Sequence, residues 1–210
     1  MQLMSFVQRQ ALRQPTLTRQ CWFFAAGSAL FASATAPGFS VIAGAGATNL
    51  LCFVGSWFFT TAAWMQHRLT DENDFPEWHS ASSQFAGTVL FNISTGAALL
   101  MHSVPARRHL VWTPDVAGSL AFLASGALAV AALGAASSGL DRWVTWINMA
   151  GCVAFALSAG AAFVRRTGAT EDQWLANVGT FVGALCFLVG ALAALPRFRK
   201  PGPTLRQSPA

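Results

Sequence analysis

The stretch GTVLFNIS, residues 87–94, introduces a pattern that the rest of the chain repeats. A glycine is followed four residues later by phenylalanine and seven residues later by a small residue. The same spacing returns in GSLAFLAS, residues 118–125, and in GCVAFALS, residues 151–158. Looser copies occupy residues 27–34, 55–62 and 183–190. The six glycines that open these segments are separated by 28, 32, 31, 33 and 32 residues.

Composition does not account for this pattern. If 18 Gly and 17 Phe were placed at random in 210 residues, about 1.5 Gly–Phe pairs would show this spacing. Positions i, i+4 and i+7 lie on one face of a helix, so each segment predicts a helix with one stripe of Gly, Phe and a small residue. The stripe residues are Gly27, Phe31, Gly55, Phe59, Gly87, Phe91, Ser94, Gly118, Phe122, Ser125, Gly151, Phe155, Ser158, Gly183, Phe187 and Gly190.

The composition predicts that lipid surrounds these helices. Hydrophobic residues make up 54% of the chain and charged residues 10%, against about 25% charged residues in soluble domains. Six apolar stretches without Asp, Glu, Lys or Arg cover residues 22–36, 47–65, 85–104, 116–139, 144–164 and 175–195. Most approach the ~20 residues that a helix needs to cross a bilayer, and they are too long for barrel strands. The sequence therefore predicts an all-α, polytopic membrane bundle of six transmembrane helices.

The stripes indicate how these helices pack. Apolar burial does not drive association inside lipid, whereas small residues allow helices to approach closely. We therefore expect the stripes to form the inner seam of the bundle, with consecutive antiparallel helices forming three repeated helical hairpins. Contacts between copies in a homo-oligomer are the alternative.

The positive charges predict an orientation. With the N-terminus inside, the cytoplasmic segments hold nine Lys and Arg residues and the opposite side holds four, which favours both termini in the cytoplasm. The net charge of +5 then fits anionic lipid headgroups at the basic termini better than nucleic acid. Twelve Arg against one Lys suggests a bacterial protein, and hence the inner membrane.

We expect three regions: a basic N-terminal segment over residues 1–20, a six-helix transmembrane domain over 21–196, and a basic disordered tail over 197–210. The motif SATAPGF, residues 33–39, leaves a cleaved signal peptide as an alternative for the first helix. The stripe in that helix favours its retention.

Motifs for chemistry are scarce. The densest polar stretch, HRLTDENDFPEWHS at residues 67–80, is interpreted as one solvated cytoplasmic loop. His67 and His79 are the candidate metal ligands in it, but their spacing fits no standard site, so we predict no metal, no cofactor and no catalytic residue. GAGATN, at residues 44–49, is interpreted as a tight connection, since no strand precedes it and no lysine follows.

Three asparagines are candidates for a polar cavity. They are Asn92, Asn148 and Asn177, and each has two interpretations. Its side chain either lines a cavity or forms a hydrogen bond with another helix, which is the commoner use.

The helices also resemble a known family. GSLAFLASGALAV and GALCFLVGALAALPR are similar to the Gly-x-x-x-Phe-x-x-Gly/Ser helices of YrhK-like membrane proteins, most closely over residues 175–197. The resemblance implies a bacterial membrane protein without an assigned activity, and it transfers no catalytic residues. Members of that family are often about one hairpin long.

Three functions follow from these observations. The leading interpretation is a non-enzymatic structural or interaction module in the membrane, whose protein partner the sequence does not identify. The alternative is a transporter or channel with a neutral, Asn- and Ser-lined path, which a continuous cavity beside Asn92 would favour. A membrane enzyme that uses the loop over residues 67–80 is the third.

Overall fold

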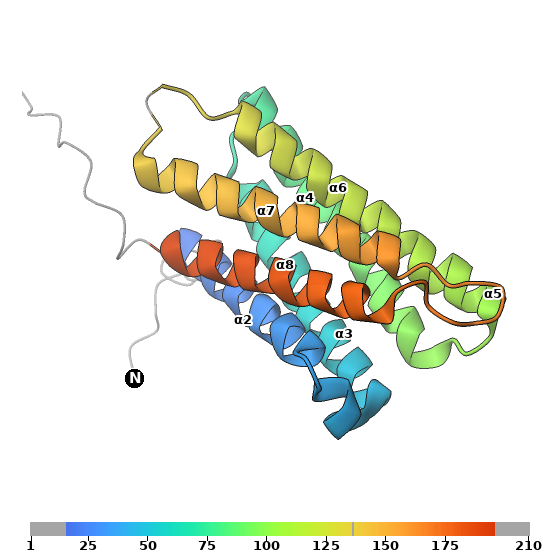
Figure 1. The fold of residues 1–210 in the computed structure, drawn as a ribbon. Helices are drawn as coiled ribbons and strands as arrows, with labels where there is room; N and C mark the ends of the chain where they lie inside the picture. The colour runs from blue at the N-terminus through green and yellow to red at the C-terminus, as the bar shows by residue number, and fades with distance from the viewer. Residues whose placement is uncertain (1–15, 136, 196–210) are drawn as a thin grey trace, which may run out of the picture.

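The computed structural model describes residues 16–135 and 137–195, and the regular secondary structure in this part of the chain is helical (Figure 1). It contains six long helices: α2 Leu17–Thr35, α3 Phe39–Leu69, α4 Phe75–Leu100, α6 Thr113–Ala131, α7 Gly139–Ala161 and α8 Gln173–Ala193. A short helix, α5 Val104–Ala106, and a π-helical turn, η1 Arg107–Trp112, lead directly into α6. No strand occurs in the described residues, only an isolated bridge between Val164 and Thr170.

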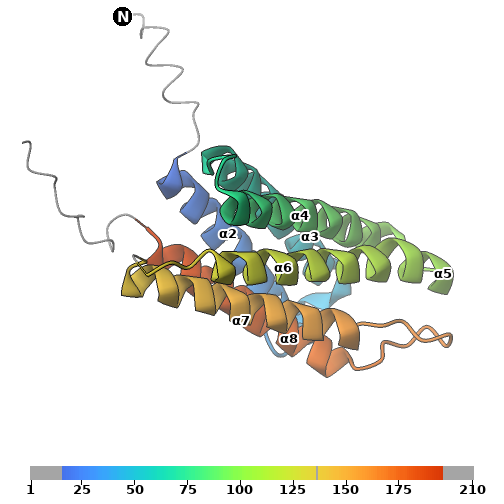
Figure 2. The same ribbon diagram turned by 90° about the horizontal axis from the view of Figure 1, so that it is seen from above.

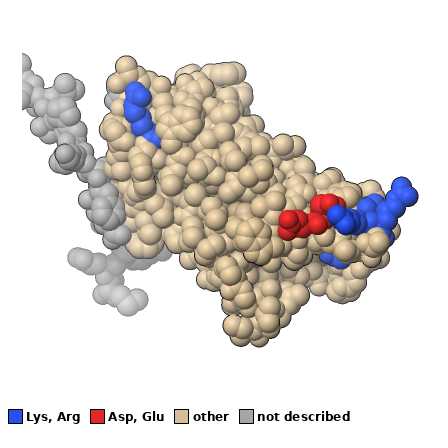
Figure 3. Space-filling view, viewed as in Figure 1, with Lys and Arg blue, Asp and Glu red and all other residues tan. Residues whose placement is uncertain are grey.

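The apolar character of these helices supports a membrane bundle. Four helical segments are long and apolar enough to cross a bilayer, namely Phe39–Leu69, Val104–Ala131, Gly139–Ala161 and Gln173–Ala193. Many large apolar side chains on the outside of the bundle are exposed, including Val41 at 86% and Trp57 at 55%. In the view of Figure 3 the charged residues lie toward the two ends, and the middle carries none. An exposed apolar surface of this kind is expected to face lipid.

The long helices lie lengthwise against one another and close into a ring (Figures 1 and 2). Each one contacts the next in the order α2, α3, α4, α6, α7, α8, and α8 contacts α2. Successive helices run in opposite directions because the connections between them are short.

Side-chain caps determine where several helices begin. Thr16 accepts a hydrogen bond from the backbone N–H of Arg19, and Asp172 accepts one from that of Leu175. Ser138 and Asp141 form a reciprocal capping box at the start of α7. These polar residues satisfy backbone donors that the first turn of a helix leaves unpaired.

Two sequence-based boundaries are wrong. The stretch over residues 67–80 is not one loop, because α3 continues to Leu69 and α4 begins at Phe75. Asp74 caps α4 with Pro76 in its first turn, so only residues 70–74 connect the two helices. Of the segment over residues 44–49, only Gly44 is non-helical, with φ +81° and ψ 162°, so two helical parts of α3 meet there at a kink. The predicted connection is therefore confined to Gly44, and residues 45–49 are helical.

The stripe glycines lie where neighbouring helices come closest. A Cβ placed on Gly87 would lie 2.7 Å from the ring of Phe122 and 3.0 Å from the carbonyl oxygen of Gly118. A Cβ on Gly118 would in turn lie 2.6 Å from the ring of Phe91. Each helix of this pair therefore places its phenylalanine against the glycine of the other.

This contact recurs in full between α7 and α8, and in one direction between α2 and α3. In α7 and α8, Gly151 faces the ring of Phe187, and Gly183 faces the ring of Phe155. In α2 and α3, a Cβ on Gly55 would lie 2.9 Å from the ring of Phe31, and one on Gly27 would lie 2.9 Å from the carbonyl oxygen of Gly55. Bulk at any of these glycines would push two helix backbones apart.

The six stripe phenylalanines meet at the centre of the ring. We call Phe31, Phe59, Phe91, Phe122, Phe155 and Phe187 the Phe cluster. Each side chain is at most 6% exposed. The centroids of contacting rings lie between 5.0 and 6.4 Å apart, in stacked, tilted and edge-on arrangements. These are the separations that aromatic rings favour, so the interior is filled at this level.

Two glycines of α7 provide a matched test of the seam. A Cβ at Gly151 would lie 2.8 Å from the Phe187 ring, whereas a Cβ at Gly160 meets no atom within 4 Å. We expect Gly151→Ala to lower the free energy of unfolding in detergent by about 1–3 kcal/mol through overpacking. Gly160→Ala should be neutral or stabilising by up to about 1 kcal/mol, because Ala favours helix. Equal effects of the two substitutions in thermal unfolding would argue against close packing at Gly151.

Candidate functional site

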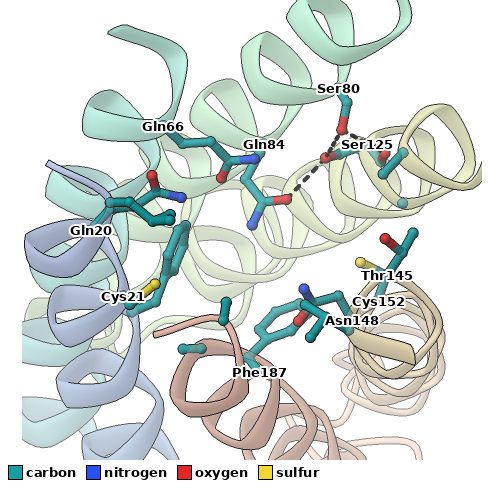
Figure 4. A pocket seen from close by; sticks show the side chains of 18 residues that line it. Gln20, Cys21, Gln66, Ser80, Gln84, Ser125, Thr145, Asn148, Cys152 and Phe187 are labelled. Atoms are coloured by element: carbon teal, nitrogen blue, oxygen red, sulfur yellow. Dashed lines mark hydrogen bonds between the residues drawn. The ribbon is translucent and has the colours of Figure 1, made fainter. Parts of the chain in front are cut away.

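One end of the bundle contains a polar cavity of about 230 Å³ (Figure 4). It lies where α2, α4 and α7 begin and where α3, α6 and α8 end. We call it the Gln cavity, after its three glutamines. Its polar lining side chains are Gln20, Cys21, Gln66, Ser80, Gln84, Ser125, Thr145, Asn148 and Cys152. Phe24 and Phe187 give it aromatic walls, and Phe187 also belongs to the Phe cluster.

The two serine hydroxyls of this cavity, those of Ser80 and Ser125, take part in one hydrogen-bond network. The Ser80 hydroxyl donates to the backbone carbonyl of Ser125 at 2.9 Å and lies 3.1 Å from the Ser125 hydroxyl. The Ser125 hydroxyl donates to Oε1 of Gln84 at 2.9 Å. This network connects α4 to α6, and it orients the carboxamide of Gln84 with its NH₂ group toward the cavity (Figure 4).

The remaining amides have open hydrogen-bonding capacity. The carboxamides of Gln20, Gln66 and Asn148 form no hydrogen bond within the part of the chain that the structure describes, and they point into the cavity together with that of Gln84 (Figure 4). Each carboxamide offers two N–H donors and one carbonyl acceptor. Among the described residues, no Asp, Glu, Lys, Arg or His lines the Gln cavity. This described lining can therefore hydrogen-bond to a ligand but supplies no formal charge.

A wider hollow of about 380 Å³ adjoins the Gln cavity on its outer side. The two share Gln66, Ser80 and Thr145, and the hollow adds the carboxylates of Glu77 and Asp141. This is the mouth of the Gln cavity, and it favours the approach of neutral or cationic molecules over that of anions.

A second cavity, of about 290 Å³, occupies the opposite end of the bundle. We call it the Asp115 cavity. Asp115 and Arg107 are its charged lining residues, and Asn49, Asn177 and Thr180 add polar groups. A carboxylate within a membrane bundle is costly and is retained for function. The Gln cavity and the Asp115 cavity share no lining residue.

Asp115 lies one residue before the predicted apolar stretch over residues 116–139. In the structure α5, η1 and α6 form one continuous candidate span, Val104–Ala131, which includes Asp115 together with Arg107 and Arg108. The turn η1 is π-helical, and π-helical turns are frequent at functional sites. The same span ends at Ala131, and Gly139, the expected end of the fourth helix, is the first residue of α7.

The segment between α7 and α8, residues 162–172, covers the Asp115 cavity, and we call it the cover segment. Val164 and Thr170 of this segment line the cavity. Arg107 Nη1 donates to the carbonyl oxygen of Gly168 at 2.9 Å, and Arg108 Nε donates to that of Val164 at 2.5 Å. The guanidinium of Arg108 also lies 5.0 Å from the centre of the Phe163 ring. Two arginines of η1 therefore hold the cover segment in place.

The cover segment has its own internal bonds. The backbone N–H of Glu171 donates to Phe163 at 2.8 Å, and that of Arg165 donates to Ala169 at 2.8 Å. Arg165 forms a two-pronged ion pair with the Glu171 carboxylate. Its hydrogen bond lowers the pKa of Glu171, so the pair is present at neutral pH and is lost only when the pH falls through that lowered pKa.

The cavity residues have a fixed relation to the Phe cluster. Gln84, Asp115, Asn148 and Thr180 each precede a cluster phenylalanine by seven residues. Gln66 follows Phe59 by seven residues. Seven residues are about two helical turns, so these side chains lie on the same face as the ring. The result is one interior face that is polar at each end and aromatic in the middle.

The structure separates the three predicted asparagines. Asn148 lines the Gln cavity and Asn177 lines the Asp115 cavity, where its side chain accepts from Gln173 at 3.0 Å. Asn92 lines neither, and its buried Oδ1 has no hydrogen-bond partner among the described residues.

The other candidates lie as follows. The His67 ring packs 5.3 Å from Trp78, and His79 packs 3.9 Å from Phe75, with its Nδ1 2.8 Å from the Phe75 carbonyl oxygen. Within residues 16–135 and 137–195, no three His, Cys, Asp or Glu side chains come together as metal ligands. Among the small stripe residues, Ser158 donates to Ala176 at 2.6 Å, Ser94 is buried, and Gly190 leaves room for the Asn148 side chain.

Sequence reasoning missed the glutamines and Asp115. All four side chains lie one or two residues outside the predicted apolar stretches, so the stretches do not include them. They are Gln20, Gln66, Gln84 and Asp115. The helices extend further and carry these side chains inward. Three of them lie seven residues from a stripe phenylalanine, and this spacing indicates the inner face of the helix: Gln66, Gln84 and Asp115.

Comparisons with protein-family models, with curated proteins and with solved structures found no match.

The two arginines predict how the cover segment responds to mutation. Arg108→Leu removes a hydrogen bond to Val164 and the contact with Phe163, so the segment should open more often. Hydrogen exchange of the backbone amides of Arg165 and Glu171 should accelerate about tenfold, the effect of losing one charge-assisted bond. Arg166→Leu is the control, because Arg166 is exposed on the same segment. Unchanged exchange in Arg108→Leu would show that the segment holds itself closed.

Proposed function

We propose that this protein moves a small neutral polar solute across the membrane and that the structure represents its closed state. The observation that supports this proposal is the order of features along the bundle. A polar cavity lies at either end, and six phenylalanine rings separate the two. Transporters place their sites between helices and open them alternately to the two sides, and an apolar constriction closes such a path.

The lining favours an uncharged solute. The Gln cavity contains amides and hydroxyls without a formal charge, so it cannot compensate an ion that leaves water. The aromatic barrier opposes ions even more strongly, because a bare charge in such surroundings has no partner. The free-energy cost of leaving water is smaller for a neutral solute than for an ion, both in the Gln cavity and at the Phe cluster.

The structural or interaction module, which was the leading interpretation of the sequence, is the second candidate here, and two observations favour it. The six side chains of the Phe cluster are packed and buried between the cavities, and Asn92, beside which a continuous cavity would favour transport, lines neither cavity. A purely structural bundle, however, has no use for three open carboxamides and a carboxylate turned inward. Such groups are costly beside lipid and are kept where they bind something. We therefore rank transport first.

The proposal includes a topology. We propose that α2 and α4 cross the membrane as well as the four most apolar segments, since all six long helices lie side by side (Figures 1 and 2). The close approach of stripe glycines in all three helix pairs, with at least one Gly–Phe ring contact in each, supports three repeated hairpins. Both termini would be cytoplasmic, in a bacterial inner membrane, with anionic headgroups near the basic ends. Residues 1–15 and 196–210, which carry most of the two terminal regions, lie outside the described residues. The YrhK-like resemblance remains part of this proposal.

Single cysteines in the loops test the topology. In a protein whose four native cysteines are replaced by alanine, Asn73→Cys and Ser137→Cys should react with a membrane-impermeant maleimide only from the cytoplasmic side. Ser103→Cys and Thr167→Cys should react only from the other side. If Asn73→Cys and Ser103→Cys react from the same side, α4 does not cross the membrane.

Solute flux tests the function. Proteoliposomes should take up urea or glycerol faster than protein-free liposomes, as measured by stopped-flow light scattering. Phe122→Ala should raise this rate further, because it removes one ring of the barrier between the cavities. The matched control is Phe75→Ala, whose ring is 67% exposed and outside the Phe cluster.

Loss of a buried Phe costs about 3–5 kcal/mol, so thermal unfolding in detergent must first show that Phe122→Ala is folded. No flux above protein-free liposomes in either the wild type or a folded Phe122→Ala variant would reject transport and leave the structural module.

A further inference from the structure

We infer that the Gln cavity binds the carboxamide or urea group of a small neutral solute. This inference rests on the proposed function and specifies the class of solute. Its basis is the convergence of four carboxamides, Gln20, Gln66, Gln84 and Asn148, from four different helices on one cavity (Figure 4).

The hydrogen-bonding pattern of the cavity is mixed. Oε1 of Gln84 is already occupied by the Ser125 hydroxyl, so the NH₂ of Gln84 is the end available to a ligand. That group requires an acceptor on the ligand. Gln20 and Gln66 present both donors and acceptors, without partners among the described residues. Oδ1 of Asn148 lies against Gly190, so the NH₂ group of Asn148 is the end available to a ligand. A ligand that satisfies them must itself both donate and accept.

Planar amides satisfy this requirement best. A carboxamide places a donor and an acceptor side by side in one plane, and Asn and Gln pair with such an edge through two hydrogen bonds at once, as they do with adenine. A hydroxyl group offers only one donor and rotates freely. Amide and urea groups therefore match the cavity better than polyols do.

The apolar part of the lining and the volume define the rest of the ligand. Phe24 and Phe187 supply ring faces beside the amides. An apolar cavity of about 150 Å³ holds benzene. The Gln cavity, at about 230 Å³, therefore has room for one six-membered ring with a carboxamide attached. The described lining holds no cationic side chain, so it favours the carboxamide over the corresponding carboxylate, whose charge these residues would leave uncompensated.

Equilibrium binding to the detergent-purified full-length protein tests this inference with nicotinamide as the radiolabelled probe. Nicotinamide should bind, and unlabelled nicotinate, which differs only in carrying a carboxylate, should compete at least tenfold more weakly. Acetamide should compete, and glycerol should not. Equal competition by glycerol or by nicotinate would overturn the carboxamide assignment.

Variants locate the site. Gln84→Met and Gln66→Met keep the length of the side chain and remove the amide, so each should weaken nicotinamide binding about tenfold. That factor corresponds to one hydrogen bond of about 1.4 kcal/mol. Gln173→Met is the control, because Gln173 lines the opposite cavity. Equal affinity in all three variants, or equal weakening by all three, would overturn the site.

The binding measurement and the flux measurement can reject the two proposals separately. Nicotinamide binding with the predicted variant pattern, in a protein without flux, would reject transport and keep the site as that of a binding protein. Flux of urea or glycerol without saturable nicotinamide binding would keep transport and reject the carboxamide class.

Discussion

The close approach of a glycine on one helix to a phenylalanine of the next is the contact on which this bundle depends. Gly87 and Gly118 show it most clearly, because each lies against a ring of the other helix and within 3.0 Å, at the Cβ position, of the other backbone. Apolar burial brings no net attraction between helices in lipid, so dispersion in such tight contacts has to hold the structure together. A single methyl group at the glycine would separate the backbones.

The same contact determines what the interior contains. Because the glycines admit rings from both sides, six phenylalanines fill the middle of the bundle and leave space only toward its ends. The polar residues two turns away from the rings then face that space. Packing at the centre and polarity at the ends are therefore consequences of one helix face, which is why a barrier and two cavities occur together.

The two ends differ in ways that bear on the proposed transport. The described lining of the Gln cavity has no charged residue, whereas its mouth carries Glu77 and Asp141. The Asp115 cavity contains a carboxylate and is covered by the cover segment, which Arg107 and Arg108 hold through backbone carbonyls. The two closures therefore differ in chemistry: polar bonds hold the cover segment at the Asp115 end, and six packed rings fill the middle.

The sequence by itself determined the membrane class, the helical content and the stripe, because charge depletion and helical spacing depend only on residue type and separation along the chain. It predicted helix ends less well: most of the stretch over residues 67–80 is helical, because capping by Asp74 starts α4 at Phe75, and residues 45–49 are helical, because the interruption of α3 is confined to Gly44. Only the tertiary structure decided that Asn148 and Asn177 lie in different cavities while Asn92 lies in neither. Which side chains share a cavity depends on how helices far apart in the chain are rotated against one another, and that rotation is set by the Gly–Phe contacts between them.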